Sequence, residues 1–217
     1  ALASSRLGRP GLVHRLDKDT SGIMVCAKND DVHRVLSAAF KSREVHKIYG
    51  TFCLGEMRQK SFDRITGHTR HPTHRKRFTT KRAPPTVNQP GRRLAHSHID
   101  VVTNNGGVSL LRVTLHTGRS HQIRAHLADL GHPILGDELY GGKAVANRLP
   151  KGAIRDAALQ LHRQALHACT LALRHPVDGR PCFWQAPWPE DLQPLLRELA
   201  SSNASATQLL QSIFTTP

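Results

Sequence analysis

The feature that most constrains the fold is a tight-turn signal near the middle of the chain. Residues 104–107 read Asn-Asn-Gly-Gly, and the segments on either side of them, within 94–117, have the character of strands. Asn and Gly tolerate the positive φ angles that a two-residue hairpin turn requires. The sequence therefore predicts a β-hairpin here, and so a sheet with antiparallel neighbours.

Further strands and several helices surround this hairpin. Short apolar runs predict strands at residues 23–27, 45–54, 165–174 and 181–186. Apolar residues at helical spacing predict a helix capped by Asp30, a second capped by Ser120 and ending at Gly131, and a third after Pro187. Strands outnumber helices and hairpins recur, so we expect an α+β fold whose mixed, mainly antiparallel sheet is flanked by helices.

The charge of the chain is high and concentrated. Lys and Arg number 31 against 16 Asp and Glu, a formal charge of +15, which predicts an anionic partner such as nucleic acid. Residues 64–99 hold nine Lys or Arg and no acid. We interpret this stretch as an arm that binds phosphates, with steep salt dependence, rather than as a merely solvated loop.

Several function classes lack support in the sequence. No apolar run reaches the roughly 18 residues of a membrane span, and the start has no signal-peptide core. The four cysteines form no C-x-x-C pair, which favours buried, reduced thiols in an intracellular protein. His71-x-x-His74 has no nearby Cys or carboxylate, so neither a metal site nor a metal-dependent hydrolase is favoured. Nucleotide-binding and hydrolase motifs of the G-x-G-x-x-G, P-loop and G-x-S-x-G types are also absent.

Two acids stand in a basic setting near the start, in the segment HRLDKDTSG. Asp17 follows Arg15 by two residues, and Asp19 follows shortly after. Nearby positive charge favours the ionised form of a carboxyl group, and a positioned carboxylate can act as a nucleophile. Taken alone, the spacing favours salt bridges or turn caps for both acids over a catalytic role.

Long segments elsewhere change this weighting. Together with HRLDKDTSG, the chain resembles the RluA/RluD family of RNA pseudouridine synthases, most closely its RluD-like branch. The resemblance runs from about residue 10 to 200 through HKIYGTF, RHPTHRKRF, HTGRSHQIRAHLADLGHPILGDELYGG, RQALHACTLALRHPVDG and FWQAPWPEDL. The segments are specific and stand in the order that the family shows.

The resemblance implies a reaction and its residues. These enzymes break the N-glycosidic bond of a uridine within RNA, rotate the base and rejoin it through carbon 5, without a cofactor. Asp17 matches the nucleophile, which attacks the ribose in one proposal and the uracil ring in another. Tyr49 is expected to stack on the uracil and assist removal of the carbon 5 proton. Arg124 is expected to pair with Asp17, and Arg15 to hold the flipped base.

The resemblance extends to substrate binding. Residues expected to contact the RNA are Arg15, Arg119, His121, Gln122, Leu171, Arg70, Arg75, Lys76 and Arg77. Leu171 or Leu173 would form an apolar wall of the pocket. His121, like His14, His126 and His167, also fits a structural role, and Asp137 is expected to be structural. Residues 19–22 are expected to shape the active-site loop.

Domain organisation follows the same comparison. We expect a catalytic domain over residues 1–200, apparently without the strand and N-K-P-x-G segment that precede HRLD in the family, and a C-terminal tail over 201–217. The favoured partner is ribosomal RNA of the large subunit, with transfer RNA as an alternative and a pre-ribosomal large subunit as a further partner. We expect the protein to be a monomer located in a bacterial cytoplasm or a mitochondrial matrix. The competing function is a ribosome assembly factor that binds RNA with or without catalysis.

Overall fold

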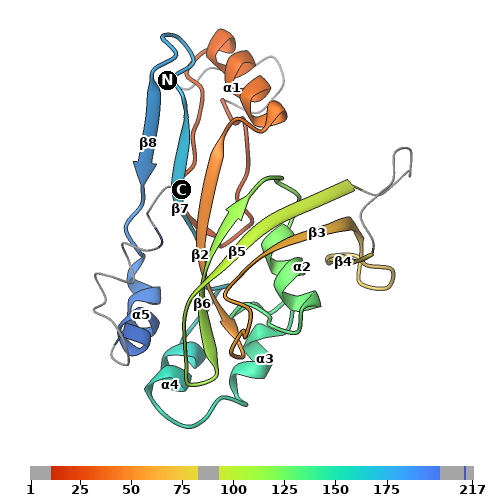
Figure 1. Cartoon of the computed structure of the whole chain (residues 1–217), viewed down its shortest axis with the longest axis vertical. Helices are drawn as coiled ribbons and strands as arrows, with labels where there is room; N and C mark the ends of the chain where they lie inside the picture. Colours follow the sequence, from red (N-terminus) through yellow and green to blue (C-terminus); the bar gives the residue numbers. More distant parts are fainter. Residues whose placement is uncertain (1–10, 83–92, 201–212, 214–217) are drawn as a thin grey trace.

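An eight-stranded sheet forms the framework of the chain (Figure 1). The computed structural model describes residues 11–82, 93–200 and 213. Strand order is β1-β7-β2-β6-β5-β3-β4, with β8 also paired to β7, and every ladder is antiparallel except β1 with β7. The strands are β1 Ser21–Gly22, β2 His46–Leu54, β3 Ser61–Arg70, β4 Phe78–Arg82, β5 Arg93–Asn105, β6 Val108–Leu115, β7 Leu166–Arg174 and β8 Pro181–Gln185. The predicted α+β class is therefore confirmed.

The central hairpin is formed as predicted. Strands β5 and β6 pair up to Asn105 and Val108, with only Gly106 and Gly107 between them. Both glycines have positive φ, 57° and 79°, which is the conformation of a type I′ turn. This turn fixes the register of β5 and β6 near the centre of the sheet.

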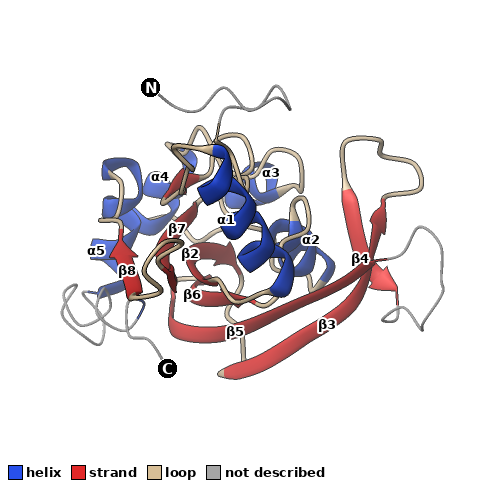
Figure 2. Cartoon of the chain, turned by 90° about the horizontal axis from the view of Figure 1, so that it is seen from above, coloured by secondary structure: helices blue, strands red, loops and turns tan. Residues whose placement is uncertain are grey.

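Helices flank the sheet, and α1 and α2 lie on the concave side of its curved strands (Figure 2). The α-helices are α1 Asp30–Ser42, α2 Gln122–Asp129, α3 Gly142–Ala146, α4 Ala153–Leu159 and α5 Gln193–Ala200, with a 3₁₀ turn at Glu190–Leu192 before α5. The predicted helix after Pro187 is thus confirmed. Its leucines at 192, 195, 196 and 199 are all buried.

Two apolar clusters hold these layers together. The main cluster contains side chains of strands β2, β5 and β6 and of helices α2, α3, α4 and α5. Phe52, Leu110 and Leu195 belong to it and are fully buried. Ile213, the one described residue of the predicted tail, is also fully buried in it. The second cluster lies between α1 and β7 and contains Leu36 and Leu171. It fastens the segment that carries HRLD against the sheet.

Several local predictions were wrong. Residues 23–27 do not form a strand, since the parallel strand β1 ends at Gly22 and Met24 is 46% exposed. The cap of α1 is Asn29, whose side chain accepts from the Val32 amide, rather than Asp30. The residue at the cap position of α2 is His121 rather than Ser120, and its side chain makes no capping hydrogen bond.

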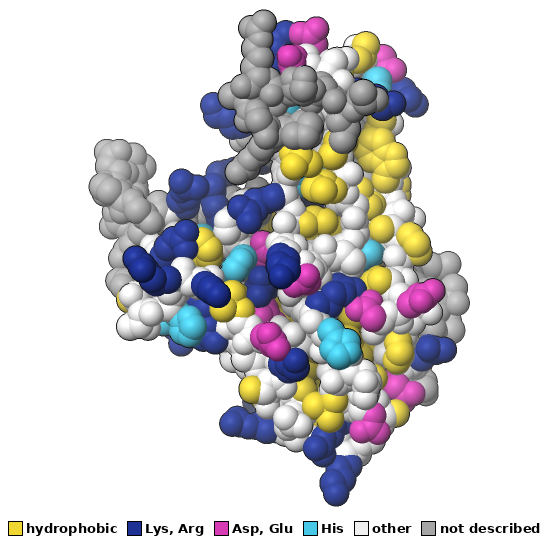
Figure 3. Space-filling model, turned by 180° about the vertical axis from the view of Figure 1, so that it is seen from behind, with side chains coloured by type: hydrophobic (Ala, Val, Ile, Leu, Met, Phe, Trp, Pro, Cys, Tyr) yellow, Lys and Arg dark blue, Asp and Glu magenta, His cyan; other side chains and the backbone are white. Residues whose placement is uncertain are grey.

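The acid-free basic stretch includes most of β3 and all of β4, two strands that the sequence did not predict. Strands β3 and β4 pair with each other at the edge of the sheet, and the turn between them carries exposed Arg75 and Lys76. Asp129, at the end of α2, fastens this hairpin by accepting hydrogen bonds from Thr79 and Thr80 of β4. Seen from behind, Lys and Arg side chains gather over this side of the molecule (Figure 3).

All four cysteines are free, but they differ in exposure. Cys53 and Cys169 are buried as expected, whereas Cys26 and Cys182 are only partly so. Burial raises the pKa of both buried thiols to about 12, which keeps them protonated and unreactive. Within the described residues, no helix combines the length and apolarity needed to cross a bilayer.

Candidate active site

Asp17 lies in a tight loop just before β1. The Thr20 amide donates to the Asp17 carbonyl at 3.0 Å, and Asp19 takes a left-handed conformation with φ of 69°. The Gln164 side chain, from the segment before β7, donates to the Lys18 carbonyl at 2.6 Å and to the Thr20 hydroxyl at 3.0 Å. The loop is therefore held from outside as well as by its own turn.

A second contact from the same segment supports this loop. Arg163 donates to the Asp19 carbonyl at 3.1 Å. Its guanidinium is itself fixed by two hydrogen bonds to the Asp191 carboxylate, at 2.7 and 2.8 Å. Such bidentate pairs have a defined orientation, so the Asp17 loop is attached to a rigid group.

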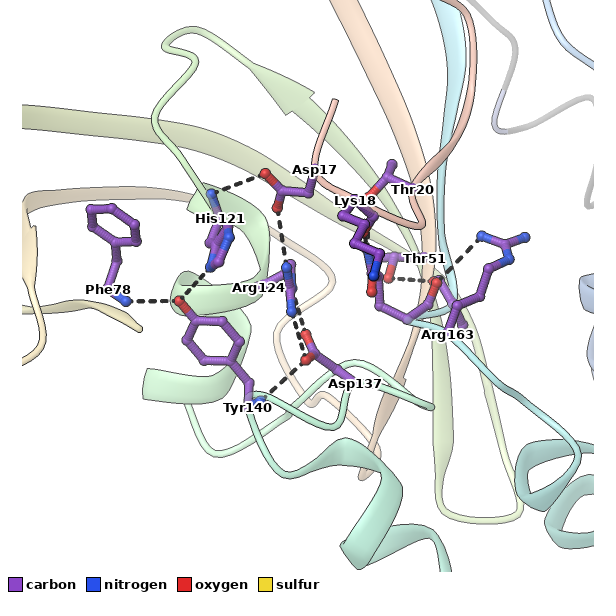
Figure 4. A network of polar contacts seen from close by, with 12 residues as sticks. Asp17, Lys18, Thr20, Thr51, Phe78, His121, Arg124, Asp137, Tyr140 and Arg163 are labelled. Atoms are coloured by element: carbon purple, nitrogen blue, oxygen red, sulfur yellow. Dashed lines mark hydrogen bonds and ion pairs between the residues drawn. The ribbon is translucent and has the colours of Figure 1, made fainter. Parts of the chain in front are cut away.

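Arg124 connects Asp17 to a buried acid (Figure 4). Its guanidinium donates twice to Asp137, at 2.7 and 2.9 Å, and Nη1 lies 3.4 Å from Asp17 Oδ2. The three side chains are 8%, 0% and 12% exposed in the order Arg124, Asp137, Asp17. Burial acts to lower the pKa of Arg124, but hydrogen bonds and charge from Asp137, with the charge of Asp17, raise it overall. Arg124 thus stays cationic and aimed at Asp17.

The second oxygen of Asp17 faces the start of α2. The His121 amide lies 3.4 Å from Asp17 Oδ1, and His121 holds the left-handed φ of 55°, which is strained for a residue with a side chain. Its ring nitrogen lies 3.2 Å from the Tyr140 hydroxyl, which accepts from the Phe78 amide at 2.9 Å. Burial lowers the pKa of His121, which favours a neutral ring that can accept a hydrogen bond from the Tyr140 hydroxyl.

Tyr49 approaches the same place from the middle of the sheet. It lies on β2, is 8% exposed, and lines one narrow cleft with Asp17, Leu16 and Leu166. Burial first, and then the charge of Asp17, raise the pKa of Tyr49 well above its usual range. The phenol is therefore neutral before any substrate enters.

The cleft between Asp17 and Tyr49 is narrow, about 60 Å³, and two wider depressions adjoin it. One, of about 530 Å³, is lined by Arg70, Arg75 and Lys76 of the β3–β4 hairpin. The other, of about 410 Å³, lies beside α1. Arg15 lines all three spaces, so the cleft is the narrow middle of a longer, cation-lined path.

The structure brings most of the predicted residues to this path. Asp17, Tyr49, Arg15, Arg119 and His121 all line the cleft, and the Arg124 guanidinium contacts Asp17 directly.

Arg77 is the fourth predicted cation of the β3–β4 hairpin, besides Arg70, Arg75 and Lys76. Arg77 does not line the depression that those three residues line but lies over the Tyr140 ring, 5.7 Å from its centroid.

Two predicted residues have other positions. Leu171 is buried in the cluster beneath α1, where β7 faces Leu36, and lines no part of the cleft, so its prediction as a pocket wall was wrong, as was that of Leu173. The apolar wall comes instead from Leu166 at the start of the same strand, and from Leu115.

Gln122 lines the cleft, but its amide is committed within the protein. The carbonyl oxygen accepts from Thr117 and from the Arg119 amide, and the amino group donates to His96 and Ser97. No side-chain donor or acceptor of Gln122 remains for substrate. Its contribution is to hold the turn before α2.

The other histidines in question are structural. His126 is fully buried and bonds Thr66 and Ser97, His14 accepts from the Val25 amide, and His167 bonds Ser21.

One group of side chains in the described part of the chain is spaced to hold a metal ion. It comprises Asp63, His96 and His116, whose ligand atoms lie within 4.8 Å of one another. None of these residues lines the narrow cleft, and none was predicted as a ligand.

Four site residues were not predicted for the positions they hold: Asp137, Tyr140, Arg163 and Gln164. Asp137 and Tyr140 both lie in GDELYGG, and Arg163 and Gln164 begin RQALHACTLALRHPVDG. The only sequence signal for these four residues was that they lie in segments that carry the family resemblance. Only the fold shows that they support Arg124, His121 and the Asp17 loop.

The geometry permits a specific chemistry. A carboxylate in a narrow cleft of mixed polar and apolar lining is oriented by a cation that a second, buried carboxylate holds in place. An aromatic ring lines the same cleft, and a base could stack on it. The cationic path on both sides suits a polyanion whose one residue enters the cleft.

Comparison with known proteins agrees with this description. The family model described as RNA pseudouridylate synthase matches residues 2–129. The chain is 38% identical over 196 residues to ribosomal large subunit pseudouridine synthase D of Nitrosomonas europaea, covering 90% of this chain and 53% of that protein. It is 40% identical over 210 residues to the protein of the same name from Xanthomonas campestris pv. campestris, covering 93% and 58%. The chain thus spans a little over half the length of these relatives.

A solved structure shares the fold. Human RNA pseudouridylate synthase domain containing 1 superposes with a TM-score of 0.67 at 24% identity, covering 95% of this chain and 81% of that one.

Proposed function

This chain belongs to the RNA pseudouridylate synthase family, and we propose from this premise that it isomerises uridines in structured RNA to pseudouridine. One observation carries the proposal: the Asp17 carboxylate, in a narrow cleft, is oriented by Arg124, which Asp137 holds with two hydrogen bonds. A protein that only bound RNA would not need a buried acid–arginine–acid arrangement at the end of its cleft.

The proposed reaction exchanges one bond for another. Asp17 attacks the flipped nucleotide, at the ribose anomeric carbon or at the uracil ring, and the glycosidic bond from the anomeric carbon to N1 breaks. The base turns, carbon 5 bonds to the anomeric carbon, the Asp17 adduct is released, and the proton on carbon 5 leaves while N1 gains one. Substrate and product are therefore isomers, and no cofactor takes part.

Each site residue has a role in this scheme. Arg124 orients Asp17, while Arg15 helps to hold the target base out of the helix. Tyr49 stacks on the uracil, which returns roughly 1–3 kcal/mol of the cost of flipping. Because burial keeps Tyr49 a neutral phenol, its hydroxyl relays the carbon 5 proton rather than serving as a standing phenolate.

The favoured substrate is ribosomal RNA of the large subunit. The relatives of about 40% identity carry the name ribosomal large subunit pseudouridine synthase D, and the cationic path suits a folded, phosphate-rich partner. Transfer RNA is the second candidate, and a pre-ribosomal large subunit is the assembled form in which the substrate would be met. We propose that the protein acts as a monomer where such RNA is made, in a bacterial cytoplasm or a mitochondrial matrix.

The substrate is tested with RNA tritiated at carbon 5 of uridine. We expect tritium release from large-subunit fragments and little from transfer RNA. Release from transfer RNA alone would refute the ribosomal substrate. Tight, salt-sensitive binding with no release from either RNA would refute catalysis and favour the alternative, an assembly factor that holds ribosomal RNA.

A further inference from the structure

The depression beside α1 is lined by cations and by no acid. We refer to it as the α1 groove, and its cationic lining residues are Arg15, Lys41, Arg43, Lys47 and Arg119. The depression on the hairpin side differs, since its lining includes the acids Asp19, Asp137 and Glu138. Cations that cluster without acids repel one another, and this repulsion is relieved when a polyanion binds among them.

Lys47 is the least exposed cation of the groove. It is only 9% exposed, and its ammonium lies 5.7 Å from the centre of the Phe40 ring. It forms no ion pair with any carboxylate of the described residues, which include every Asp and Glu of the chain. Burial first, and then the charge of Arg43, lower the pKa of Lys47. A largely buried, unpaired lysine is costly unless a ligand supplies the missing anion.

Arg43 adds a second indication at the mouth of the groove. It ends α1 with φ of 66°, a left-handed cap conformation that favours glycine. An arginine stands there although glycine would relieve the strain. Its charge also acts, after burial and Arg93, to lower the pKa of Arg119 across the groove. The charges of the two sides therefore already interact.

The groove opens onto the catalytic cleft. Arg15, Tyr49 and Arg119 line both spaces, so a chain leaving the cleft on this side enters the groove directly. We infer that the α1 groove binds the phosphodiester backbone of the RNA strand next to the target uridine, with Lys47 at its floor and Lys41 and Arg43 at its rim. The inference rests on the proposed function only in taking RNA as the ligand.

The test removes rim charges without disturbing the fold. The variant Lys41→Ala/Arg43→Gly loses two exposed cations and gains glycine where the backbone favours it. The matched control, Arg148→Ala/Lys151→Ala, removes two exposed cations between α3 and α4, at the end of the molecule opposite α1 (Figure 1). A third variant, Lys47→Met, removes the floor charge while keeping an unbranched side chain of similar length.

The measurement is the fluorescence anisotropy of a labelled large-subunit RNA stem-loop with single-stranded flanks, titrated at several salt concentrations. Each single-strand phosphate contact contributes about 0.7 to the salt slope. We expect the rim variant to lower the slope by about 1.4 and Lys47→Met by about 0.7, with affinity falling on the order of tenfold for the rim variant and no change in the control.

The outcomes separate this inference from the proposed function. Unchanged slopes in both groove variants would overturn the groove, even if tritium release proves the enzyme. Equal losses in the groove variants and in the control would also overturn it, because any surface charge would then suffice. Lower slopes in the groove variants alone would support it, even if no uridine were isomerised.

Discussion

The Arg124–Asp137 pair is the contact whose loss should affect the site most clearly. In Asp137→Asn, one hydrogen bond to the guanidinium can persist, but the carboxylate charge that balances it is removed. Asp137 is fully buried and Arg124 nearly so, and breaking such a pair from one side costs roughly 3–5 kcal/mol. At about 2–4 °C per kcal/mol for a chain of this size, the melting temperature should fall by about 6–20 °C.

The same substitution should slow catalysis. Arg124 is the cation that faces Asp17 Oδ2, and a displacement of about 1 Å at a reacting group can cost about 100-fold in rate. Thermal unfolding followed by circular dichroism measures the first effect, and tritium release at a temperature where the variant is folded measures the second.

The neighbouring residue supplies the control for this prediction. Glu138 pairs with Lys143 on the surface, with side chains 75% and 50% exposed, so Glu138→Gln should leave both the melting temperature and the rate nearly unchanged. The reasoning is refuted if Asp137→Asn melts within about 2 °C of the natural protein and retains its rate.

Three further predictions follow from the site and its surroundings. Tyr49→Phe should bind RNA within a factor of about 3, because the stacking face is kept, yet lose about 10²–10⁴ in tritium release; an unchanged rate would remove the hydroxyl from the reaction. Gln164→Ala removes two hydrogen bonds that hold the Asp17 loop, so kcat should fall with little change in KM. A raised KM with unchanged kcat would instead assign Gln164 to RNA binding. Burial lowers the pKa of His126 to about 3. As pH falls below about 6.5, His126 is therefore protonated in the unfolded chain but stays neutral in the folded protein. Unfolding free energy should therefore drop by about 2 kcal/mol from this residue at pH 5, and in His126→Asn the slope below pH 6.5 should be shallower; an identical slope would contradict the assignment.

Local chemistry explains which elements the sequence could predict. The 104–107 turn and the leucines after Pro187 carry their own conformational signal, and both formed as expected. Strands β3 and β4 could not be predicted from the sequence, because they have few apolar residues and many charged ones. They are strands because they pair at the edge of the sheet. The apolar run at 23–27 reads as a buried strand, yet packing against α1 rather than a ladder accounts for it.

The site divides in the same way. Asp17, Tyr49 and Arg124 were expected from motifs. The fold brings Asp17 and Tyr49 to one cleft and places Arg124 in contact with Asp17, although the three are far apart in the chain. Leu171 was misplaced because a strand residue one step out of phase faces the opposite layer. The pairing of Asp137 with Arg124 depends on how the loop after α2 folds back onto that helix, which periodicity and spacing do not encode.

The central claim is that Asp17 is the nucleophile of an RNA uridine isomerisation. The most direct measurement is tritium release from large-subunit RNA by Asp17→Asn, beside Asp19→Asn as a control. Asp19 is exposed, lies in the same loop, and has a left-handed conformation that asparagine also accepts. We predict that Asp17→Asn binds RNA with near-natural affinity and releases no tritium, while Asp19→Asn keeps most of the activity. Release by Asp17→Asn at the natural rate would contradict the account.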